Sequence, residues 1–413
     1  MDKVINPSPV HGEIRPPCSK SYAQRAMAGA LLCDGETTLG NIELCDDTRY
    51  AMQVITDLGA KVTRTGDTEY VIRGGLSPVS DTINTGESGL ATRLFTPIAA
   101  LCDRKITITG SGSMLRRPID MMIKPLEKLG ATVESDGFLP ISVRGPLRGG
   151  ESDVDARVSS QFLTGLLMSS PLAADDTILH VEQPNSLPYL AMTVDLASKF
   201  GIRMEHNSFR EFFIPGEQRY RPARISIEGD WSSAAFMLVA GAIAGEVKTT
   251  EMNRISLQAD LAVLDALTRA GAVIITTPDT VTVRKRELSG FDFNATHCPD
   301  LFPILAVLGA YCSGTTTVKG VNRLIHKESN RADAILGEYT KLGLDVEFQD
   351  DVMTVRGGKL HGGTVDSCND HRIAMAAAIA ALGAAAPVTI TNAQAVSKSY
   401  PRFWDDLSAL TAD

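Results

Sequence analysis

The sequence predicts an α/β protein of two similar domains, each built from three β-α-β-α-β-β repeats. Three observations lead to this prediction. A short Leu-Gly-Ala-like string recurs along the chain, a helical pattern of apolar residues precedes it, and alternating strand patterns follow it. A chain of 413 residues, 44% of them hydrophobic, is long enough for two or three domains that each bury a core.

The recurring string marks the end of one helix in each repeat. Its glycines stand roughly 71 residues apart, which is a long period for a repeat protein. They are Gly59, Gly130, Gly201, Gly271 and Gly343. Each suits a left-handed C-cap, because glycine adopts a positive φ without steric cost.

The domain boundaries follow from the repeat count. Six repeats would need about 420 residues, so the last glycine would fall just past the end of the chain. We expect the strand-turn-strand segment Val4 to Arg15 to complete the last repeat. The chain would then cross between domains near Arg15 and near Ser226. The predicted domains are residues 16–226, and residues 227–413 together with residues 1–15.

The stretch from 119 to 169 shows the order of elements within a repeat. An apolar helix pattern from Ile119 to Leu129 leads to a strand at 132–135 and an alternating strand at 141–144. A turn rich in Gly and Pro and a further short strand follow. The repeat ends in a helix of small residues from Ser160 to Ser169.

A polar cluster stands at the start of each small-residue helix. The clusters are Cys18–Arg25, Gly86–Arg93, Ser159–Gln161, Asp230–Ser233, His297–Asp300 and Asn369–Arg372. Helix capping explains the Ser, Asp and Asn residues. It does not explain Lys20, Arg25, Arg93 and Arg372, because cations are disfavoured in the first turn of a helix. An anion bound at the helix start by cations and free N–H groups would explain them.

Further cations stand where other helices are predicted to begin. The strings Leu115–Ile119, His326–Arg331 and Ser397–Pro401 are each expected to open a helix, and Asn185–Tyr189 is a turn leading into another. Cations repeated at helix starts indicate a site for a small polyanionic molecule.

Composition excludes several other classes of protein. The net charge of −9 argues against nucleic acid as a partner. No apolar run reaches the ~18–20 residues of a membrane span, and Met1 to Val10 lacks the pattern of a signal peptide. The seven scattered cysteines are expected to be reduced thiols in a cytoplasmic protein. Cys368 and His371 are too few ligands for zinc, so no metal is predicted.

The motifs, taken together, resemble a known family. Pro17–Arg25 is similar to the P-x-S-K-S-x-x-x-R stretch of the 5-enolpyruvylshikimate-3-phosphate synthase family. Later strings resemble its later motifs in order and spacing: Leu115–Ile119, Ser159–Thr164, Lys327–Arg331, Asp370–Met375 and Ser397–Pro401. This family has two three-repeat domains joined by two crossover strands, an inside-out α/β barrel, which agrees with the repeat found above.

The resemblance implies a transferase of the shikimate pathway, which leads to chorismate and the aromatic amino acids. It would move the carboxyvinyl group of phosphoenolpyruvate to the 5-hydroxyl of shikimate 3-phosphate through a tetrahedral adduct, and release phosphate. Both substrates are anionic, and no cofactor is required. We expect a monomer whose partners are these small molecules, without nucleic acid or membrane.

The resemblance also implies the site residues. Asp300 would be the base for the 5-hydroxyl, and Glu328 would serve the methylene carbon, with Lys20 sharing the proton transfer. The residues implied to bind shikimate 3-phosphate are Lys20, Ser21, Arg25, Ser159, Ser160, Gln161, Ser186, Asp300 and Lys327. Those implied to bind phosphoenolpyruvate are Lys20, Gly89, Arg117, Gln161, Arg331, Arg372 and Lys398. Contacts from Tyr189 and Arg323 stay open. Residue by residue, a plain N-cap is the alternative for Asp300.

Three residues depart from the family pattern. Glu87 stands where an amide is usual, Leu90 where a hydroxyl is usual, and Asn330 where an Asp is common. A carboxylate beside an anionic substrate is unfavourable unless a cation such as Arg93 neutralises it. Glyphosate occupies the phosphoenolpyruvate site in this family, so Glu87 and Leu90 imply reduced glyphosate sensitivity.

Two alternative functions remain open. The sister enzyme that uses a UDP-amino sugar carries S-K-N-A in its first motif and commonly a loop cysteine. Here the first motif reads Ser19-Lys20-Ser21, and Met114 to Arg117 contains no cysteine. A non-catalytic repeat protein that binds anions is the second alternative, against which Asp300 and Glu328 together argue.

Overall fold

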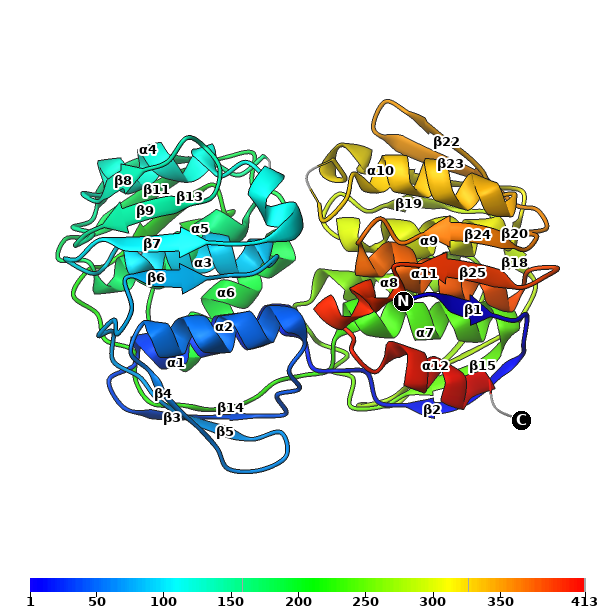
Figure 1. Cartoon of the computed structure of the whole chain (residues 1–413), viewed down its shortest axis with the longest axis horizontal. Coiled ribbons are helices and arrows are strands. Elements are labelled where there is room, and N and C mark those ends of the chain that lie inside the picture. The colour runs from blue at the N-terminus through cyan, green and yellow to red at the C-terminus, as the bar shows by residue number, and fades with distance from the viewer. Residues whose placement is uncertain (158, 326, 412–413) are drawn as a thin grey trace. The chain divides into compact units, whose positions relative to one another are not determined.

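The chain divides into two compact units in the computed structural model, which describes residues 1–157, 159–325 and 327–411. The first unit is Lys20–Ile227, and the second is Met1–Ser19 with Glu228–Asp413 (Figure 1). The chain thus passes between units after Ser19 and after Ile227, where the sequence places crossings near Arg15 and Ser226. None of the helices in the described part of the chain has the length and apolar character of a membrane-spanning segment.

The described part of the first unit carries three four-stranded sheets and a set of buried helices (Figure 1). The buried helices are α1 (Lys20–Leu32), α3 (Gly89–Ala99) and α5 (Gln161–Ser169). One sheet has the order β14 (Arg224–Ser226), β3 (Glu36–Gly40), β5 (Tyr70–Arg73), β4 (Lys61–Arg64). The next is β6 (Thr82–Asn84), β7 (Ile106–Thr109), β9 (Ile141–Arg144), β8 (Thr132–Glu134). The third is β10 (Gly150–Asp155), β11 (Thr177–Glu182), β13 (Glu211–Ile214), β12 (Glu205–Asn207). The other helices are α2 (Asp46–Asp57), α4 (Ile123–Lys128), α6 (Leu187–Lys199), η1 (Gly112–Arg116), η2 (Asp120–Met122) and η3 (Ser170–Leu172).

The second unit repeats this plan. Its buried helices are α7 (Trp231–Ala244), α9 (Phe302–Ala310) and α11 (His371–Leu382). One sheet has the order β2 (Val10–Ile14), β15 (Gly245–Thr249), β17 (Val281–Arg284), β16 (Val273–Thr276). The next is β19 (Asp292–Asn294), β21 (Thr315–Lys319), β23 (Val352–Arg356), β22 (Asp345–Gln349). The third has three strands, β1 (Lys3–Ile5), β25 (Val388–Thr391) and β24 (Gly363–Asp366). A short pair joins β18 (Leu288–Ser289) to β20 (Cys312–Ser313). The other helices are α8 (Val263–Arg269), α10 (Arg331–Ala334), α12 (Phe403–Thr411), η4 (Ala259–Ala262), η5 (Pro299–Leu301), η6 (Val321–Arg323), the π-helix η7 (Ile335–Tyr339), η8 (Thr340–Leu342) and η9 (Ala393–Lys398).

The small-residue helices form the centre of each unit because most of their residues are small or apolar. Every residue of α7 is buried, as is every residue of α3 and α11. A helix that is hydrophobic all round is stable only when it is enclosed. Small residues allow close packing: a Cβ on Gly165 of α5 would come within 2.5 Å of the Arg93 carbonyl oxygen of α3.

The predicted glycine turns are confirmed. Gly59, Gly130, Gly201, Gly271 and Gly343 all have a positive φ, between 81° and 112°. Each lies just before a strand of the repeat, where a left-handed residue reverses the chain. The predicted small-residue helices also begin at the predicted clusters, although in the His297–Asp300 cluster a 3₁₀ turn, η5, precedes α9.

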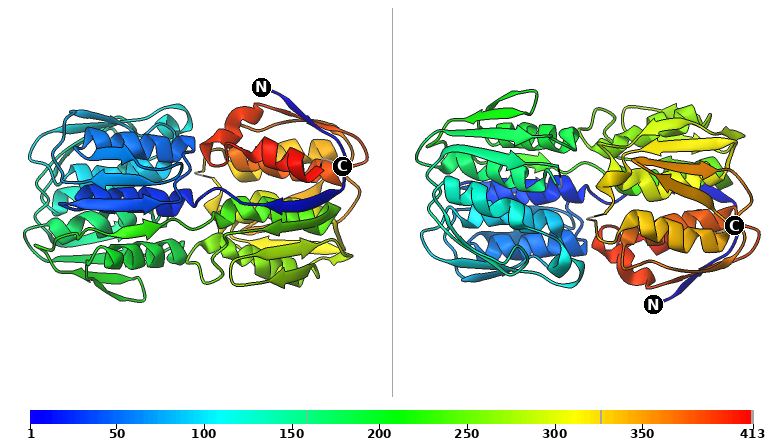
Figure 2. Two further views of the ribbon diagram at one scale, coloured as in Figure 1. Left: turned by 90° about the horizontal axis from the view of Figure 1, so that it is seen from below. Right: turned by 90° about the horizontal axis from the view of Figure 1, so that it is seen from above.

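The prediction for the N-terminal segment is correct for one of its two strands. Strand β1 pairs with β25 and so completes the last repeat. Strand β2 instead pairs in parallel with β15, at the start of the fourth repeat, and Figure 2 shows these strands side by side. Strand β14 pairs in parallel with β3 in the same way within the first unit.

One of the three predicted helix openings is confirmed and two are wrong. Helix α10 begins at Arg331, the last residue of its string, with Asn330 as N-cap, and continues as the π-helix η7. Arg116 instead ends η1, Arg117 is extended, and the α-helix that follows begins only at Ile123. Lys398 ends η9, and α12 begins only at Phe403. In these two cases the cation ends a 3₁₀ helix, and the α-helix begins after the string.

Candidate active site

Lys20 lies at the first position of α1 and is held by an acidic partner. Its Nζ lies 2.8 Å from Oδ2 of Asp47, in the first turn of α2. Both side chains are mostly buried, at 15% and 12% exposure, so this ion pair is less screened than a surface pair. The pair fixes the ammonium group of Lys20 at the helix start.

Arg25 is fully enclosed one turn further along α1. Its Nε donates to Thr193 at 2.9 Å, Nη1 donates to the Ser21 carbonyl at 2.8 Å, and Nη2 donates to Thr164 at 3.1 Å. Burial lowers the pKa of Arg25 to about 10, although the neighbouring Tyr189 opposes this shift. The Tyr189 ring lies 5.8 Å from the guanidinium carbon of Arg25. Thr164 and Thr193 were not predicted as part of this cluster.

The start of α5 gathers the next predicted residues. The Ser159 hydroxyl accepts from the Gln161 N–H at 3.2 Å, and Ser160 is buried at the N-cap position. Oε1 of Gln161 accepts from Nη1 of Arg93 at 3.0 Å. Arg93 thus orients the Gln161 side chain and also donates to the Pro118 carbonyl at 3.0 Å.

Ser186 has an unusual backbone conformation. It is buried at the N-cap of α6 with φ 53°, in the left-handed region that non-glycine residues seldom adopt. Such strained residues are concentrated at functional sites. It lies three residues before Tyr189, which faces Arg25.

Arg117 lies directly on the start of α3. A Cβ on Gly89 would come within 2.6 Å of Nη1 of Arg117, so any larger residue at this position would force the guanidinium to shift. Arg117 is buried, and its Nε and Nη1 have no hydrogen-bond partner among the described residues. A buried donor without a partner is costly, so this arrangement favours an anionic ligand.

In the second unit, Asp300 connects the predicted cations. Its Oδ1 accepts from Lys327 at 3.0 Å and from Arg331 at 2.6 Å, and its Oδ2 accepts from Arg372 at 3.1 Å. It lies within η5, whose N-cap is Cys298, so the alternative of a plain N-cap is wrong for Asp300.

Arg331 is fully buried and bonded to three carboxylates. Besides Asp300, its Nη2 donates to Glu328 at 2.7 Å and its Nε donates to Asp370 at 2.8 Å. Asp370 also caps α11 by accepting from the Arg372 N–H at 2.9 Å. Arg331 therefore has partners although Asn330 replaces the common Asp, and the Asn330 amide donates to Asp333 at 2.6 Å.

Lys398 reaches the same helix start from η9. Its Nζ donates to the Asn369 carbonyl at 2.7 Å, next to Asp370, and the side chain is buried. Arg323, whose role stayed open, lies at the end of η6. Burial lowers the pKa of Arg323, while the charge of Asp300 opposes the shift.

The cluster perturbs the carboxylates in opposite directions. Burial favours the neutral form of Asp300, but Arg372, Lys327 and Arg331 together hold its pKa well below the usual range. Burial and the charge of Asp300 raise the pKa of Asp260 to about 6. Asp260 is fully buried in η4 and accepts from the Ser232 hydroxyl at the start of α7. Such divergent pairs are typical of sites that move protons.

The structure thus places the predicted residues in two groups. Lys20, Ser21, Arg25, Gly89, Arg117, Ser159, Ser160, Gln161 and Ser186 lie in the first unit; Asp300, Lys327, Glu328, Arg331, Arg372 and Lys398 lie in the second. The structure adds Asp47, Asp260 and Asp370 to the predicted site residues. Asp370 belongs to the Asp370–Met375 motif, and a cap residue two positions before Arg372 is a signal that the sequence itself contains. The roles of Asp47 and Asp260 depend instead on contacts with residues distant in sequence.

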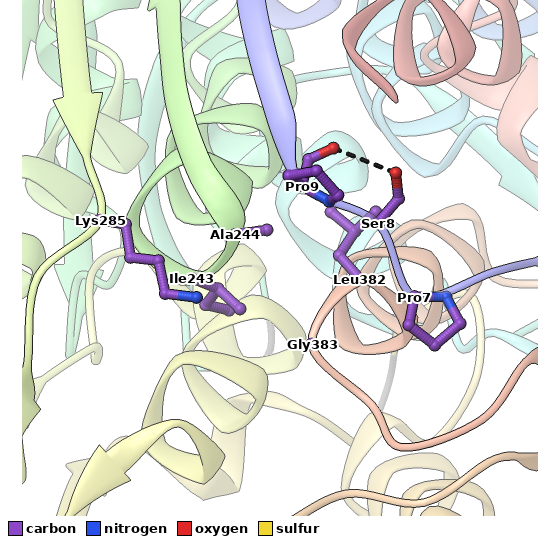
Figure 3. Close-up of a pocket in the computed structure, with 8 residues that line it drawn as sticks. All are labelled: Pro7, Ser8, Pro9, Ile243, Ala244, Lys285, Leu382 and Gly383. Carbon is purple, nitrogen blue, oxygen red and sulfur yellow. Dashed lines mark hydrogen bonds between the residues drawn. The ribbon is translucent and has the colours of Figure 1, made fainter. Parts of the chain in front are cut away.

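Two cavities of the second unit lie away from these groups. One of about 330 Å³ is bordered by Ala244 and Leu382, the last residues of α7 and α11, and by Pro7 to Pro9 (Figure 3). A larger one of about 610 Å³ includes Tyr311 and Cys312, just after α9. Asp300 and Arg372 lie at the opposite, N-terminal ends of α9 and α11. These cavities are therefore not the site described above.

Comparisons with known proteins agree over the whole chain. A family model described as EPSP synthase (3-phosphoshikimate 1-carboxyvinyltransferase) matches residues 4–407. A 3-phosphoshikimate 1-carboxyvinyltransferase from Clostridium novyi (strain NT) is 38% identical, over 97% of this chain and 95% of the relative. One from Thermococcus kodakarensis is 39% identical, over 97% of this chain and 98% of the relative.

Solved structures confirm the predicted fold class. An EPSP synthase from Acinetobacter baumannii superposes with a TM-score of 0.84 at 24% identity, covering 99% of this chain and 98% of that chain. The enolpyruvyl transferase NikO from Streptomyces tendae superposes with a TM-score of 0.80 at 18% identity, covering 99% and 97%. With the full-length family match and the relatives above 30% identity, the chain belongs to the EPSP synthase family, the 3-phosphoshikimate 1-carboxyvinyltransferases.

Proposed function

We propose that this chain transfers the carboxyvinyl group of phosphoenolpyruvate to the 5-hydroxyl of 3-phosphoshikimate and releases phosphate. Membership of the family supports the reaction class. The observation that carries the proposal furthest is Arg117, a buried guanidinium with hydrogen-bond donors left over. An enzyme for two anionic substrates requires such donors, and they are costly to bury without a ligand.

We assign anion binding to the cations of both groups. In the second unit, Lys327, Arg331, Arg372 and Lys398 stand beside Asp300, Glu328 and Asp370, so cations exceed carboxylates by one. Arg331 and Arg372 suit the carboxylate of phosphoenolpyruvate, because a guanidinium matches a carboxylate with two hydrogen bonds. In the first unit, Lys20, Ser21, Arg25, Ser159, Ser160, Gln161 and Ser186 are assigned to 3-phosphoshikimate, and Lys20, Gly89, Arg117 and Gln161 to phosphoenolpyruvate.

Asp300 is the proposed base. It takes the proton of the 5-hydroxyl while that oxygen bonds to the enol carbon, and Glu328 and Lys20 share delivery of a proton to the methylene carbon. In the elimination, the new methyl group returns its proton to Glu328 or Lys20 as the bond to phosphate breaks, and Asp300 gives the proton of the former hydroxyl to the departing phosphate. The acid and the base are thus restored to their starting states.

Asp300 is a weak base in the ligand-free protein, because Arg372, Lys327 and Arg331 hold its pKa low and disfavour its protonation. Its role as a base therefore requires that substrate binding raise this pKa. An anionic substrate bound to Arg372 and Arg331 would offset their charge and raise the pKa of Asp300 toward the range of an effective base. Substrate binding and base strength would therefore be coupled.

Phosphate release tests the proposed function. The protein is incubated with phosphoenolpyruvate and 3-phosphoshikimate together, and with each alone. Release that requires both substrates is expected. Binding of both without release would support a non-catalytic anion-binding protein instead.

A further inference from the structure

Glu87 makes a contact that its position in the sequence did not suggest. It stands two residues before α3, and its Oε2 accepts from the Ser113 backbone N–H at 3.1 Å and from the Ser113 hydroxyl at 3.0 Å. Ser113 is buried and lies in η1, the turn that leads to Arg117. Hydrogen bonds to a charged acceptor are roughly twice as strong as neutral ones.

The turn approaches this carboxylate closely. Gly112, the first residue of η1, has φ 53°, and a Cβ there would come within 2.2 Å of the Glu87 carboxyl carbon. Glycine adopts this left-handed backbone without strain, and any larger residue would also force the Glu87 carboxylate to shift. Gly112 therefore permits the close contact between Glu87 and η1.

Arg117 depends on the same turn. Its backbone N–H donates to the Met114 carbonyl at 3.3 Å, and the Met114 N–H donates to the Ser111 carbonyl at 3.1 Å, so η1 sets the position from which the side chain extends. The guanidinium then returns to Gly89, two residues after Glu87. The loop is thus attached to the start of α3 at two points.

We infer that Glu87 is a positioning residue for Arg117: its carboxylate holds η1 against the start of α3 and so fixes the guanidinium that binds phosphoenolpyruvate. This inference rests on the proposed function. It gives a reason for an acidic residue near an anionic substrate, because two donors from Ser113 stabilise the charge of Glu87. An amide oxygen would accept the same hydrogen bonds more weakly.

A double-mutant cycle on phosphate release tests the inference. Glu87→Ala should raise the KM for phosphoenolpyruvate about 10-fold, with kcat and the KM for 3-phosphoshikimate changed less than about twofold, as expected when one positioned contact is lost. Ser113→Ala removes one of the two donors and should raise the KM for phosphoenolpyruvate about threefold. The double variant should be no worse than Glu87→Ala alone, because both changes remove one interaction. Glu87→Gln should recover most of the loss.

The matched control is Glu134→Ala, since Glu134 is an exposed first-unit glutamate paired only at the surface with Lys105. It should leave every constant unchanged. Independent, additive effects of Glu87 and Ser113 would overturn the inference and indicate direct contact of Glu87 with substrate. An unchanged KM in Glu87→Ala would also overturn it. If Glu87→Ala does not fold, Glu87→Gln and Ser113→Ala with their double variant give the same comparison. Absence of turnover in the native protein would instead refute the proposed function.

Discussion

The guanidinium of Arg117 occupies the space where a side chain on Gly89 would lie: a Cβ there would come within 2.6 Å of Nη1 and 2.9 Å of Nη2. Gly89 is the first residue of α3, a position whose backbone N–H has no acceptor within the helix. The two residues together place a cation and backbone donors side by side, which is the arrangement that binds phosphate at a helix N-terminus.

Substitution of Gly89 by Ala should displace Arg117. We expect the KM for phosphoenolpyruvate to rise about 10- to 100-fold, in the range of a single steric misfit in a pocket. The melting temperature should change little, because alanine favours the helix. Steady-state phosphate release measures the effect. Gly337→Ala is the control, since a Cβ at Gly337 meets nothing within 4 Å.

Asp300→Asn should reduce turnover by about 10²–10⁴-fold, the usual range for a general acid–base group. The amide keeps the size of the carboxyl but cannot take the proton. Asp370→Asn is the comparison, because Asp370 also pairs with Arg331. We expect Asp370→Asn to raise the KM for phosphoenolpyruvate more than it lowers kcat. Equal kinetic losses in both variants would assign Asp300 a purely structural role.

Asp260 should make the protein less stable as the pH rises from about 4 to 6. In the unfolded chain its pKa is near the ordinary ~3.9, whereas burial and Asp300 raise the folded-state pKa to about 6. The native state therefore keeps a proton that the unfolded chain has lost, and the stability present at low pH is lost through this window. The free energy of unfolding should fall by about 3 kcal/mol in total over this pH range.

The comparison with Asp260→Asn isolates this effect, since Asp300, with its depressed pKa, contributes with the opposite sign. The unfolding free energy of the variant minus that of the native protein should increase between pH 4 and pH 7. A difference that is constant over this range would show that Asp260 does not titrate there.

Glyphosate sensitivity should depend on the start of α3. Leu90 is buried in its first turn. We expect its side chain, which is bulkier than Thr, to narrow the space near Gly89. Glyphosate is longer than phosphoenolpyruvate, so crowding should affect the inhibitor more, by roughly 10–200-fold. The ratio of inhibition constant to KM for phosphoenolpyruvate, in native protein and in Glu87→Asn with Leu90→Thr, measures this. An unchanged ratio in the double variant would remove the basis for reduced sensitivity.

The repeat made most of the fold predictable. Gly59 and its counterparts recur because every repeat needs a left-handed residue at the same point, and this requirement is local in sequence. The pairing of β2 with β15 was not predicted because it joins residues about 235 positions apart. The alternating pattern of a strand does not indicate which other strand it pairs with. The predicted helix opening at Pro118 is wrong because Arg117 has an extended backbone after η1 and the α-helix begins only at Ile123.

Site residues could be predicted from the sequence where the helix that carries them does not explain their residue type. Cations such as Lys20 and Arg372 oppose the helix dipole, so their presence required a ligand or a partner. Asp47 and Asp260 do have local explanations, as acidic residues in the first turns of helices, and this concealed their partners Lys20 and Ser232. Glu87 was recognised as unusual, but its contact with Ser113 depends on the path of the η1 turn.

The choice of acceptor tests the central claim most directly. Native protein is supplied with phosphoenolpyruvate and either 3-phosphoshikimate or a UDP-amino sugar, and kcat/KM for phosphate release is measured for each acceptor. We expect turnover with 3-phosphoshikimate and none above background with the nucleotide sugar, and turnover should fall about 10²–10⁴-fold in Asp300→Asn. Turnover with the UDP-amino sugar alone would contradict the account.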